Sequence, residues 1–113
     1  MRPDLIKLVK ENNICLECCP VSNKILGYIH DMRTHPVRAL LANGVKVSIN
    51  PDDHGFFSSP GVTLDYLMAY LNWGLNIADI KQLCLNTIEF STINEADKAG
   101  LREFFDYKWH LFC

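Results

Sequence analysis

The segment that decides how this chain folds is Val45-Lys46-Val47-Ser48-Ile49-Asn50-Pro51-Asp52-Asp53. Apolar and polar side chains alternate from residue 45 to 50. Successive side chains of a strand point to opposite faces, so the alternation predicts a strand with one apolar face. Two adjacent carboxylates, Asp52 and Asp53, follow the strand. Because neighbouring like charges repel, the pair indicates a site for a cation, a metal or a proton-sharing substrate. A solvated turn is the alternative.

Further motifs stand on both sides of this segment. Upstream lie Ile14-Cys15-Leu16-Glu17-Cys18-Cys19-Pro20-Val21-Ser22-Asn23 and then His35-Pro36. In this order the motifs resemble the E-x-C-P-x-S-N and S-x-N/S-x-D-D strand ends of the adenosine deaminase family. Similarity to its secreted branch, the adenosine deaminase-related growth factors, rests on Asp31-Met32-Arg33-Thr34-His35-Pro36, Asn86-Thr87-Ile88-Glu89-Phe90-Ser91-Thr92 and Lys108-Trp109-His110-Leu111-Phe112. The resemblance covers the chain from about residue 14 onward.

The resemblance also implies a fold. The family has a (β/α)8 TIM barrel, which typically needs about 250 residues, whereas this chain has 113. We therefore expect residues 1–113 to be the C-terminal segment of a metal-dependent adenosine deaminase-like domain. Its fold class would be α/β: an incomplete barrel with the last two strands, the seventh and eighth, and their helices.

The same resemblance assigns roles to the two aspartates. Hydrolytic deamination of adenosine to inosine and ammonia needs an activated water, which a bound zinc supplies by lowering the pKa of that water toward ~7. In the family the first aspartate of the pair ligates zinc and orients the water, and here it would be Asp52. The second accepts a hydrogen bond at the purine N7 edge, and here it would be Asp53. The substrate would be adenosine or 2′-deoxyadenosine.

The other catalytic parts of the family have no counterpart in these residues. No H-x-H and no H-A-G-E motif occurs, and the four histidines follow no zinc-ligand spacing, so we interpret them as surface or capping residues: His30, His35, His54 and His110. His54 also replaces the proline that usually follows D-D in the family. We expect this chain to be inactive by itself. Two alternatives are a non-catalytic, growth-factor-like binding protein on the same scaffold and an unrelated small α/β interaction domain.

Composition narrows the set of partners. The net charge is -2 and no lysine or arginine cluster occurs, which argues against nucleic acid or an anionic membrane surface. No apolar run approaches the ~18 residues of a membrane span, and the first residues contain no signal-peptide core. The resemblance to the secreted branch implies an extracellular full-length protein whose signal lies outside these residues. A cytoplasmic location is the alternative, and a homodimer of the full-length protein stays open.

The five cysteines do not form a recognisable framework. Their spacing matches neither a regular disulfide pattern nor a zinc site with two ligand pairs, so we interpret them as buried thiols: Cys15, Cys18, Cys19, Cys84 and Cys113.

Periodicity and capping signals predict six helices and two strands. The helices are expected at about 3–11, 24–31, 36–43, 64–73, 76–88 and 94–112, and the strands at 14–18 and 45–50. Pro20 is expected to end the first strand, Asn94 to cap the last helix, and Gly44 and Gly74 to end their helices. Trp73 and Trp109 are expected to be packing residues. Two apolar stripes are expected to face the core: Leu64, Leu67, Met68 and Leu71, and then Leu101, Phe104, Phe105, Trp109 and Phe112.

For the polar residues beside the motifs we expect mainly structural roles. Glu17 is expected to anchor the adjacent loop by hydrogen bonds, with a buried functional acid as the alternative. Ser22 and Asn23 are expected to cap the following helix. Lys46 is expected either to line the base of the barrel or to be solvated.

Overall fold

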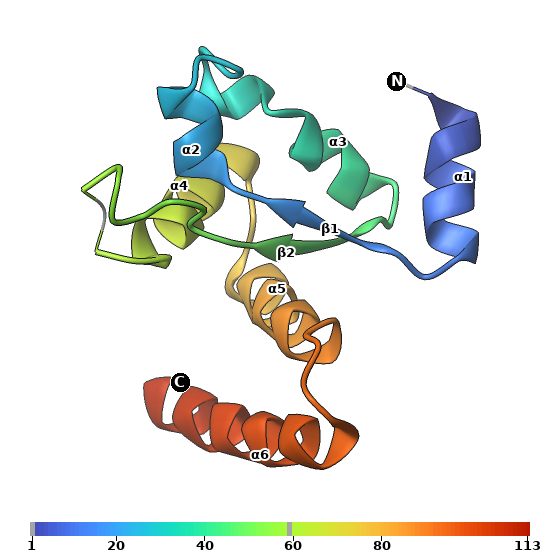
Figure 1. Cartoon of the computed structure of the whole chain (residues 1–113), viewed down its shortest axis with the longest axis vertical. Helices are drawn as coiled ribbons and strands as arrows, with labels where there is room; N and C mark the ends of the chain where they lie inside the picture. Colours follow the sequence, from blue (N-terminus) through green and yellow to red (C-terminus); the bar gives the residue numbers. More distant parts are fainter. Residues whose placement is uncertain (1, 59) are drawn as a thin grey trace.

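A computed structural model describes residues 2–58 and 60–113. Its described part contains two parallel strands surrounded by helices (Figure 1). The elements in chain order are α1 (Pro3–Glu11), β1 (Cys15–Cys18), α2 (Pro20–Ile25), the 3₁₀ helix η1 (Met32–Thr34), α3 (Pro36–Ala42), β2 (Lys46–Ile49), α4 (Thr63–Trp73), α5 (Ile77–Glu89) and α6 (Glu95–Phe112).

The two strands form the unit that the sequence predicts. They pair in parallel, with Leu16 opposite Val47 and Cys18 opposite Ile49. The pairing continues past β2, where the Asn50 amide donates to the Cys18 carbonyl at 2.9 Å. Because the strands are parallel, their carboxyl ends meet at the same edge of the sheet. The segments that follow the strands, which carry the motifs, therefore become neighbours.

The helix expected at 24–31 is wrong in both of its bounds. Helix α2 begins at Pro20 and ends at Ile25. Proline needs no amide hydrogen-bond partner at the first helical position, and its fixed φ already suits a helix, so Pro20 both stops the strand and starts the helix. Ser22 and Asn23 consequently lie inside α2 and are not its caps.

Helix α3 begins at Pro36, as predicted, and ends at Ala42, one residue before the expected end. His35 precedes Pro36 and its Nδ1 accepts a hydrogen bond from the Val37 amide at 3.1 Å, which caps the first turn. The chain leaves the helix through Gly44, whose φ of +74° lies in the left-handed region that favours glycine. Strand β2 starts two residues later.

The core lies between one face of the sheet and helices α3, α4 and α5. Its fully buried members include Val47 and Ala69, both at 0% exposure. The other buried side chains of the cluster are Cys18, Met32, Val37, Ile49, Trp73 and Leu83. The Trp73 indole also donates to the Met32 carbonyl at 3.0 Å, so α4 is bound to η1 by packing and by a hydrogen bond. Trp73 is therefore a packing residue, as predicted.

Helix α4 faces the core with a different side from the one predicted. Its buried residues are Asp65, Ala69 and Trp73, whereas Leu67 and Leu71 of the expected stripe are 48% and 66% exposed. The small Ala69 lets the helix approach the core closely, and the leucines then point away from it. Gly74 ends the helix with a φ of +67°, as predicted.

Helix α6 lies beyond α5, on the side away from the strands (Figure 1). Within the described chain its one buried residue is Lys98. Phe104 and Phe112 are 57% and 72% exposed, so much of the predicted stripe is wrong as a core face. Phe105 and Trp109 are half-buried, with ring centroids 5.6 Å apart.

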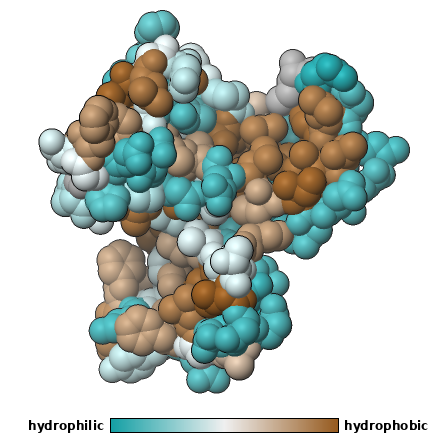
Figure 2. Space-filling view, viewed as in Figure 1, coloured by the Kyte–Doolittle hydropathy of each residue, from teal (hydrophilic) through white to brown (hydrophobic). Residues whose placement is uncertain are grey.

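Apolar side chains are also exposed on α1, where Leu5 and Leu8 are each about half accessible. Figure 2 shows such apolar surface, in brown, over several separate parts of one face of the molecule. None of the described helices has the length and apolar character that crossing a bilayer requires.

Candidate functional site

The acidic pair stands in the turn directly after β2, and both carboxylates are exposed. Asp52 has a φ of +54°, a left-handed conformation that aspartate tolerates better than most residues. The Asp52 carbonyl accepts from the His54 amide at 3.0 Å, and the Asp53 carbonyl accepts from the Phe57 amide at 3.0 Å. Both aspartates therefore belong to one hydrogen-bonded turn.

Ser22 fixes the Asp52 side chain. The Ser22 hydroxyl donates to Asp52 Oδ2 at 2.7 Å, and Ser22 itself is 1% exposed. The bond joins the segment after β1 to the segment after β2. Sequence reasoning took Ser22 for a helix cap and missed this role. The S-N motif marked the residue, but only the parallel pairing shows that it faces Asp52.

Asp65 positions the helix that carries Ser22. Its Oδ1 accepts a hydrogen bond from the Val21 amide at 3.0 Å, across 44 positions of sequence. Asp65 is 1% exposed and its Oδ2 is buried without a partner among the described residues. Burial raises the pKa of the Asp65 carboxyl. A hydrophobicity pattern does not reveal this residue, because it occupies a core position on α4.

His35 holds three segments together behind the site. Its Nδ1 accepts from the Val37 amide, so Nε2 carries the proton and donates to Asn23 Oδ1 at 3.0 Å. Cys18 Sγ lies 3.9 Å from the same nitrogen. Burial lowers the pKa of His35 and raises the pKa of the Cys18 thiol to about 12. The thiol therefore stays protonated near neutral pH, and this Cys-His contact is structural rather than nucleophilic.

The remaining histidines lie at the surface, whereas the cysteines differ in their burial. His30, His54 and His110 are exposed, in agreement with the surface interpretation. All five cysteines are free thiols. Cys18 is buried and three others are half-buried, but Cys113 is exposed, so the buried-thiol interpretation is wrong for that residue.

Glu17 and Lys46 lie on the face of the sheet that is opposite the core. Glu17 is exposed and its carboxylate accepts no hydrogen bond from the described residues, so the predicted anchoring role is wrong. It lines an open hollow of about 420 Å³ with polar neighbours that include Ser48 and Asn50. Lys46 is exposed, as one of its two interpretations required, and donates to Asn13 Oδ1 at 2.6 Å.

The residues present can supply one ligand to a metal. In the described part of the chain, no three histidine, cysteine, aspartate or glutamate side chains converge on one point. Asp52 nevertheless has the properties of a single ligand: one carboxylate oxygen is held by Ser22, while its Oδ1 is free of hydrogen bonds from described residues. Carboxylate oxygen is an accepted zinc donor, but a zinc site needs three or four ligands. The others would have to come from outside this chain.

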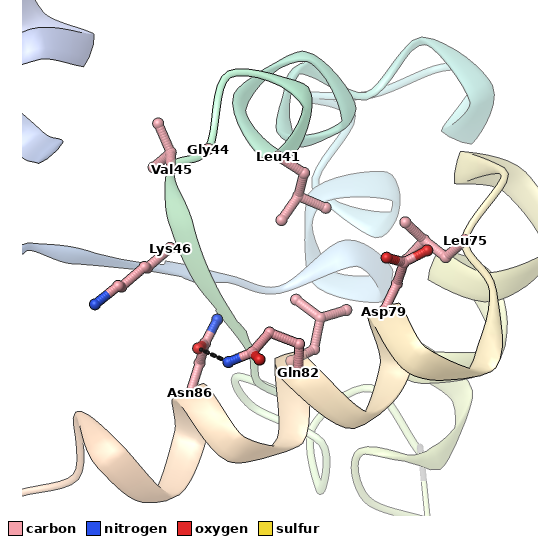
Figure 3. Close-up of a pocket in the computed structure, with 9 residues that line it drawn as sticks. Leu41, Gly44, Val45, Lys46, Leu75, Asp79, Gln82 and Asn86 are labelled. Carbon is pink, nitrogen blue, oxygen red and sulfur yellow. Dashed lines mark hydrogen bonds between the residues drawn. The ribbon is translucent and has the colours of Figure 1, made fainter.

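Two hollows lie at opposite ends of the strands. One of about 380 Å³ opens beside Asp52 and is lined by Cys19, Ser22, Asn23 and His35 among others. Another of about 320 Å³ lies where β2 begins, between α3 and α5 (Figure 3). Carboxyl ends of strands carry the active sites of (β/α)8 barrels, so the hollow beside Asp52 is the candidate site.

Comparison with known proteins agrees with this geometry. The family model described as "Adenosine deaminase" matches residues 2–108. The chain belongs to the adenosine deaminase family. It is 41% identical to adenosine deaminase 2 of Dictyostelium discoideum over 97% of this chain and 20% of the relative. It is 36% identical to adenosine deaminase 2 of Sus scrofa over 88% of this chain and 20% of the relative.

Solved structures show the same fold. An adenine deaminase from Arthrobacter aurescens superposes with a TM-score of 0.85 at 25% identity, over 96% of this chain and 32% of that structure. The N6-methyl-AMP deaminase of Arabidopsis thaliana superposes with a TM-score of 0.82 at 23% identity, over 95% of this chain and 32% of that structure. The chain thus spans about a fifth to a third of these relatives, and its two strands and helices form part of a (β/α)8 barrel, as predicted.

Proposed function

We propose that residues 1–113 supply one zinc ligand and one substrate-binding carboxylate to a zinc-dependent adenosine deaminase. The observation that carries the proposal is the Ser22–Asp52 hydrogen bond of 2.7 Å, made where the carboxyl ends of two parallel strands meet. A buried serine held against an otherwise exposed carboxylate fixes one oxygen and leaves the other available. A merely solvated turn does not need this arrangement.

Each residue near the strand ends has a defined task in this proposal. Asp52 offers one carboxylate oxygen to the metal, and Ser22 restricts its rotation. Asp53, the next residue, accepts a hydrogen bond at the purine N7 edge of adenosine or 2′-deoxyadenosine. A bound zinc would lower the pKa of a water molecule, so that a nucleophilic hydroxide would be available near neutral pH. Asp65 and His35 keep α2 and α3 in place around these groups.

The proposal extends to the protein as a whole. Two relatives are named adenosine deaminase 2, and the motifs resemble the secreted branch, so we place the full-length protein outside the cell. This chain alone would be inactive, because it offers a single ligand. Purified residues 1–113 should neither retain stoichiometric zinc nor convert adenosine to inosine. Chelator-sensitive turnover by this chain alone would contradict this.

The two aspartate roles can be separated by mutation in a complete barrel. Residues 1–113 would replace the homologous segment of the Dictyostelium relative, giving a protein that we call the complete chimera. Asp52→Ala should remove both zinc and activity, the latter by at least about 10³-fold, because metal catalysis contributes several kcal/mol. Asp53→Ala should keep zinc and lose activity. Zinc is measured by elemental analysis and activity by inosine formation.

Asp4→Ala is the matched control, since Asp4 is exposed and forms an ion pair with Arg2. It should leave zinc and turnover unchanged. Equal zinc loss in the Asp52 and Asp53 variants would show that the two roles are assigned wrongly. An unmodified complete chimera that folds without zinc and without activity would favour the growth-factor-like binding protein instead.

A further inference from the structure

Strand β2 has one edge that β1 does not cover. The Asn50 amide bonds to β1, and peptide groups of a strand point alternately to its two edges. The peptide groups of Val47 and Ile49 therefore point to the other edge. No described strand pairs there, and the two-stranded sheet ends at β2.

A side chain of helix α5 reaches this edge. Asn86 Nδ2 donates to the Val47 carbonyl at 2.8 Å, and both residues are buried, at 6% and 0% exposure. Figure 3 shows Asn86 on α5 beneath β2, with Gln82 one turn earlier on the same helix. Asn86 belongs to the 86–92 motif of the sequence, which by itself assigned it no role.

The orientation of the Asn86 amide is determined by its second bond. Gln82 Nε2 donates to Asn86 Oδ1 at 3.0 Å. With its oxygen engaged by a donor, the amide turns its nitrogen toward the Val47 carbonyl. The pair of bonds thus distinguishes asparagine from the isosteric aspartate, which has no donor for the Val47 carbonyl.

We propose that Asn86 is a positioning residue for the Asp52–Asp53 pair, acting through the Val47 carbonyl. Strand β2 leads directly into the pair and is held on its two edges by different groups. On the β1 side the Asn50 amide and the Ser22–Asp52 bond hold the strand end. On the other side, Asn86 attaches β2 to α5 and thereby fixes the position of the strand along its own axis relative to that helix. The inference rests on the proposed function for its catalytic consequence.

The test uses the complete chimera with Asn86→Asp. We expect its zinc dissociation constant, measured by chelator competition, to rise at least about tenfold, the scale seen when outer partners of metal ligands are removed. Amide hydrogen exchange at residues 48–54 should become at least about tenfold faster. Gln82→Ala removes only the donor that orients Asn86. It should change both readouts in the same direction by about two- to threefold. Because Gln82 is exposed, this variant should fold even if Asn86→Asp does not.

Asn72→Asp is the matched control. Asn72 donates to a carbonyl of its own helix, Met68, at 2.9 Å instead of to a carbonyl of β2. It should leave both readouts within about twofold of the parent. Zinc affinity and exchange at 48–54 that stay at parental values in both the Asn86 and Gln82 variants, with only the melting temperature lowered, would overturn the inference. A parent chimera without zinc would contradict the proposed function, while the exchange measurement would still decide the role of Asn86.

Discussion

Helices α5 and α6 follow one another in the chain and carry similar amphipathic patterns, yet they end in different surroundings. Helix α5 packs along β2 and buries Leu83, Asn86 and Ile88. Helix α6 contacts α5 and leaves Phe104, Leu111 and Phe112 largely exposed. The links between the two helices are polar or partly exposed: Lys81 to Asp106 at 3.5 Å and Arg102 to Glu89 at 3.7 Å.

The difference shows that an apolar stripe predicts a helix and a face, but does not determine what covers that face. Strand β2 lies against α5 and buries its stripe. For α6, and for the outward leucines of α4, no described element supplies such a surface. Exposed apolar groups of this extent are typical of surfaces that pack against something else. The molecule thus has a packed region, built on the strands, and an open region formed by α1, α6 and the outer face of α4.

The largest expected effect concerns the open region. We expect residues 1–113 in isolation to aggregate, to remain molten or to self-associate. At ~25 cal/mol per Å², several hundred Å² of apolar surface left in water forfeits on the order of 10 kcal/mol, which is comparable to the stability of a whole domain. The uncovered strand edges add to the tendency to associate. Sedimentation and thermal melting measure this.

The complete chimera is the comparison for that experiment, since the same residues there have their barrel neighbours. A sharp two-state melt of a monomeric 113-residue chain above about 50 °C would remove the distinction between the two regions.

The next effect separates the regions by mutation. In the complete chimera, Trp73→Ala should lower the free energy of unfolding by about 3–5 kcal/mol, because it empties a buried site and removes the bond to the Met32 carbonyl. In the isolated chain, Phe112→Ser should reduce self-association, because this side chain is 72% exposed. Denaturant titration of the chimera and light scattering of the isolated chain give the two readouts. Self-association that is unchanged in Phe112→Ser would contradict an open apolar surface on α6.

Acid should act on the packed region through His35. Burial lowers its folded pKa below the ordinary value, so below about pH 6.5 the unfolded chain binds a proton that the folded chain does not, and stability is lost as the pH falls toward the folded pKa. The loss is about 1.4 kcal/mol for each unit by which the pKa is lowered. His35→Asn retains a capping acceptor and should reduce the loss, measured as melting temperature at pH 7.5 and pH 5.

His110→Asn, on the exposed end of α6, should leave that acid response unchanged. The raised pKa of Asp65 acts in the opposite direction, since its stabilising contribution is largest at low pH and falls as the pH rises. An acid response that is the same in His35→Asn and in the parent would place the sensitivity elsewhere.

The smallest effect concerns the link between the two helices. Lys81→Ala removes the contact with Asp106 and the placement of the ammonium 5.7 Å from the Trp109 ring centroid. Because Asp106 is mostly exposed, we expect a loss below about 1 kcal/mol that shrinks at high salt. The control is Lys108→Ala, an exposed position where the ammonium lies 5.6 Å from the ring centroid of Phe104 on the same helix. A salt-independent loss of several kcal/mol would contradict a weakly attached α6.

Sequence reasoning succeeded where a local rule was sufficient. The alternation at 45–50 located β2, Gly44 and Gly74 ended their helices, and Asn94 caps α6 through the Asp97 amide. It failed where two rules competed at one residue. Pro20 ends a strand and also starts a helix, and the prediction used only the first of these two rules. Ser22 was therefore expected before the helix, although it lies inside it. The zinc and purine roles of Asp52 and Asp53 stay predictions.

The sequence by itself determined the strands, most helix ends, the family and the acidic pair, because these follow from backbone preferences and from short motifs. Only the tertiary structure decided that Ser22 contacts Asp52, that Asn86 binds the Val47 carbonyl and that α4 buries Ala69 instead of its leucines. These contacts join residues 30 or more positions apart or depend on which surface a helix meets. Periodicity describes one element at a time, whereas burial and hydrogen bonding depend on the partner that another part of the chain brings to it.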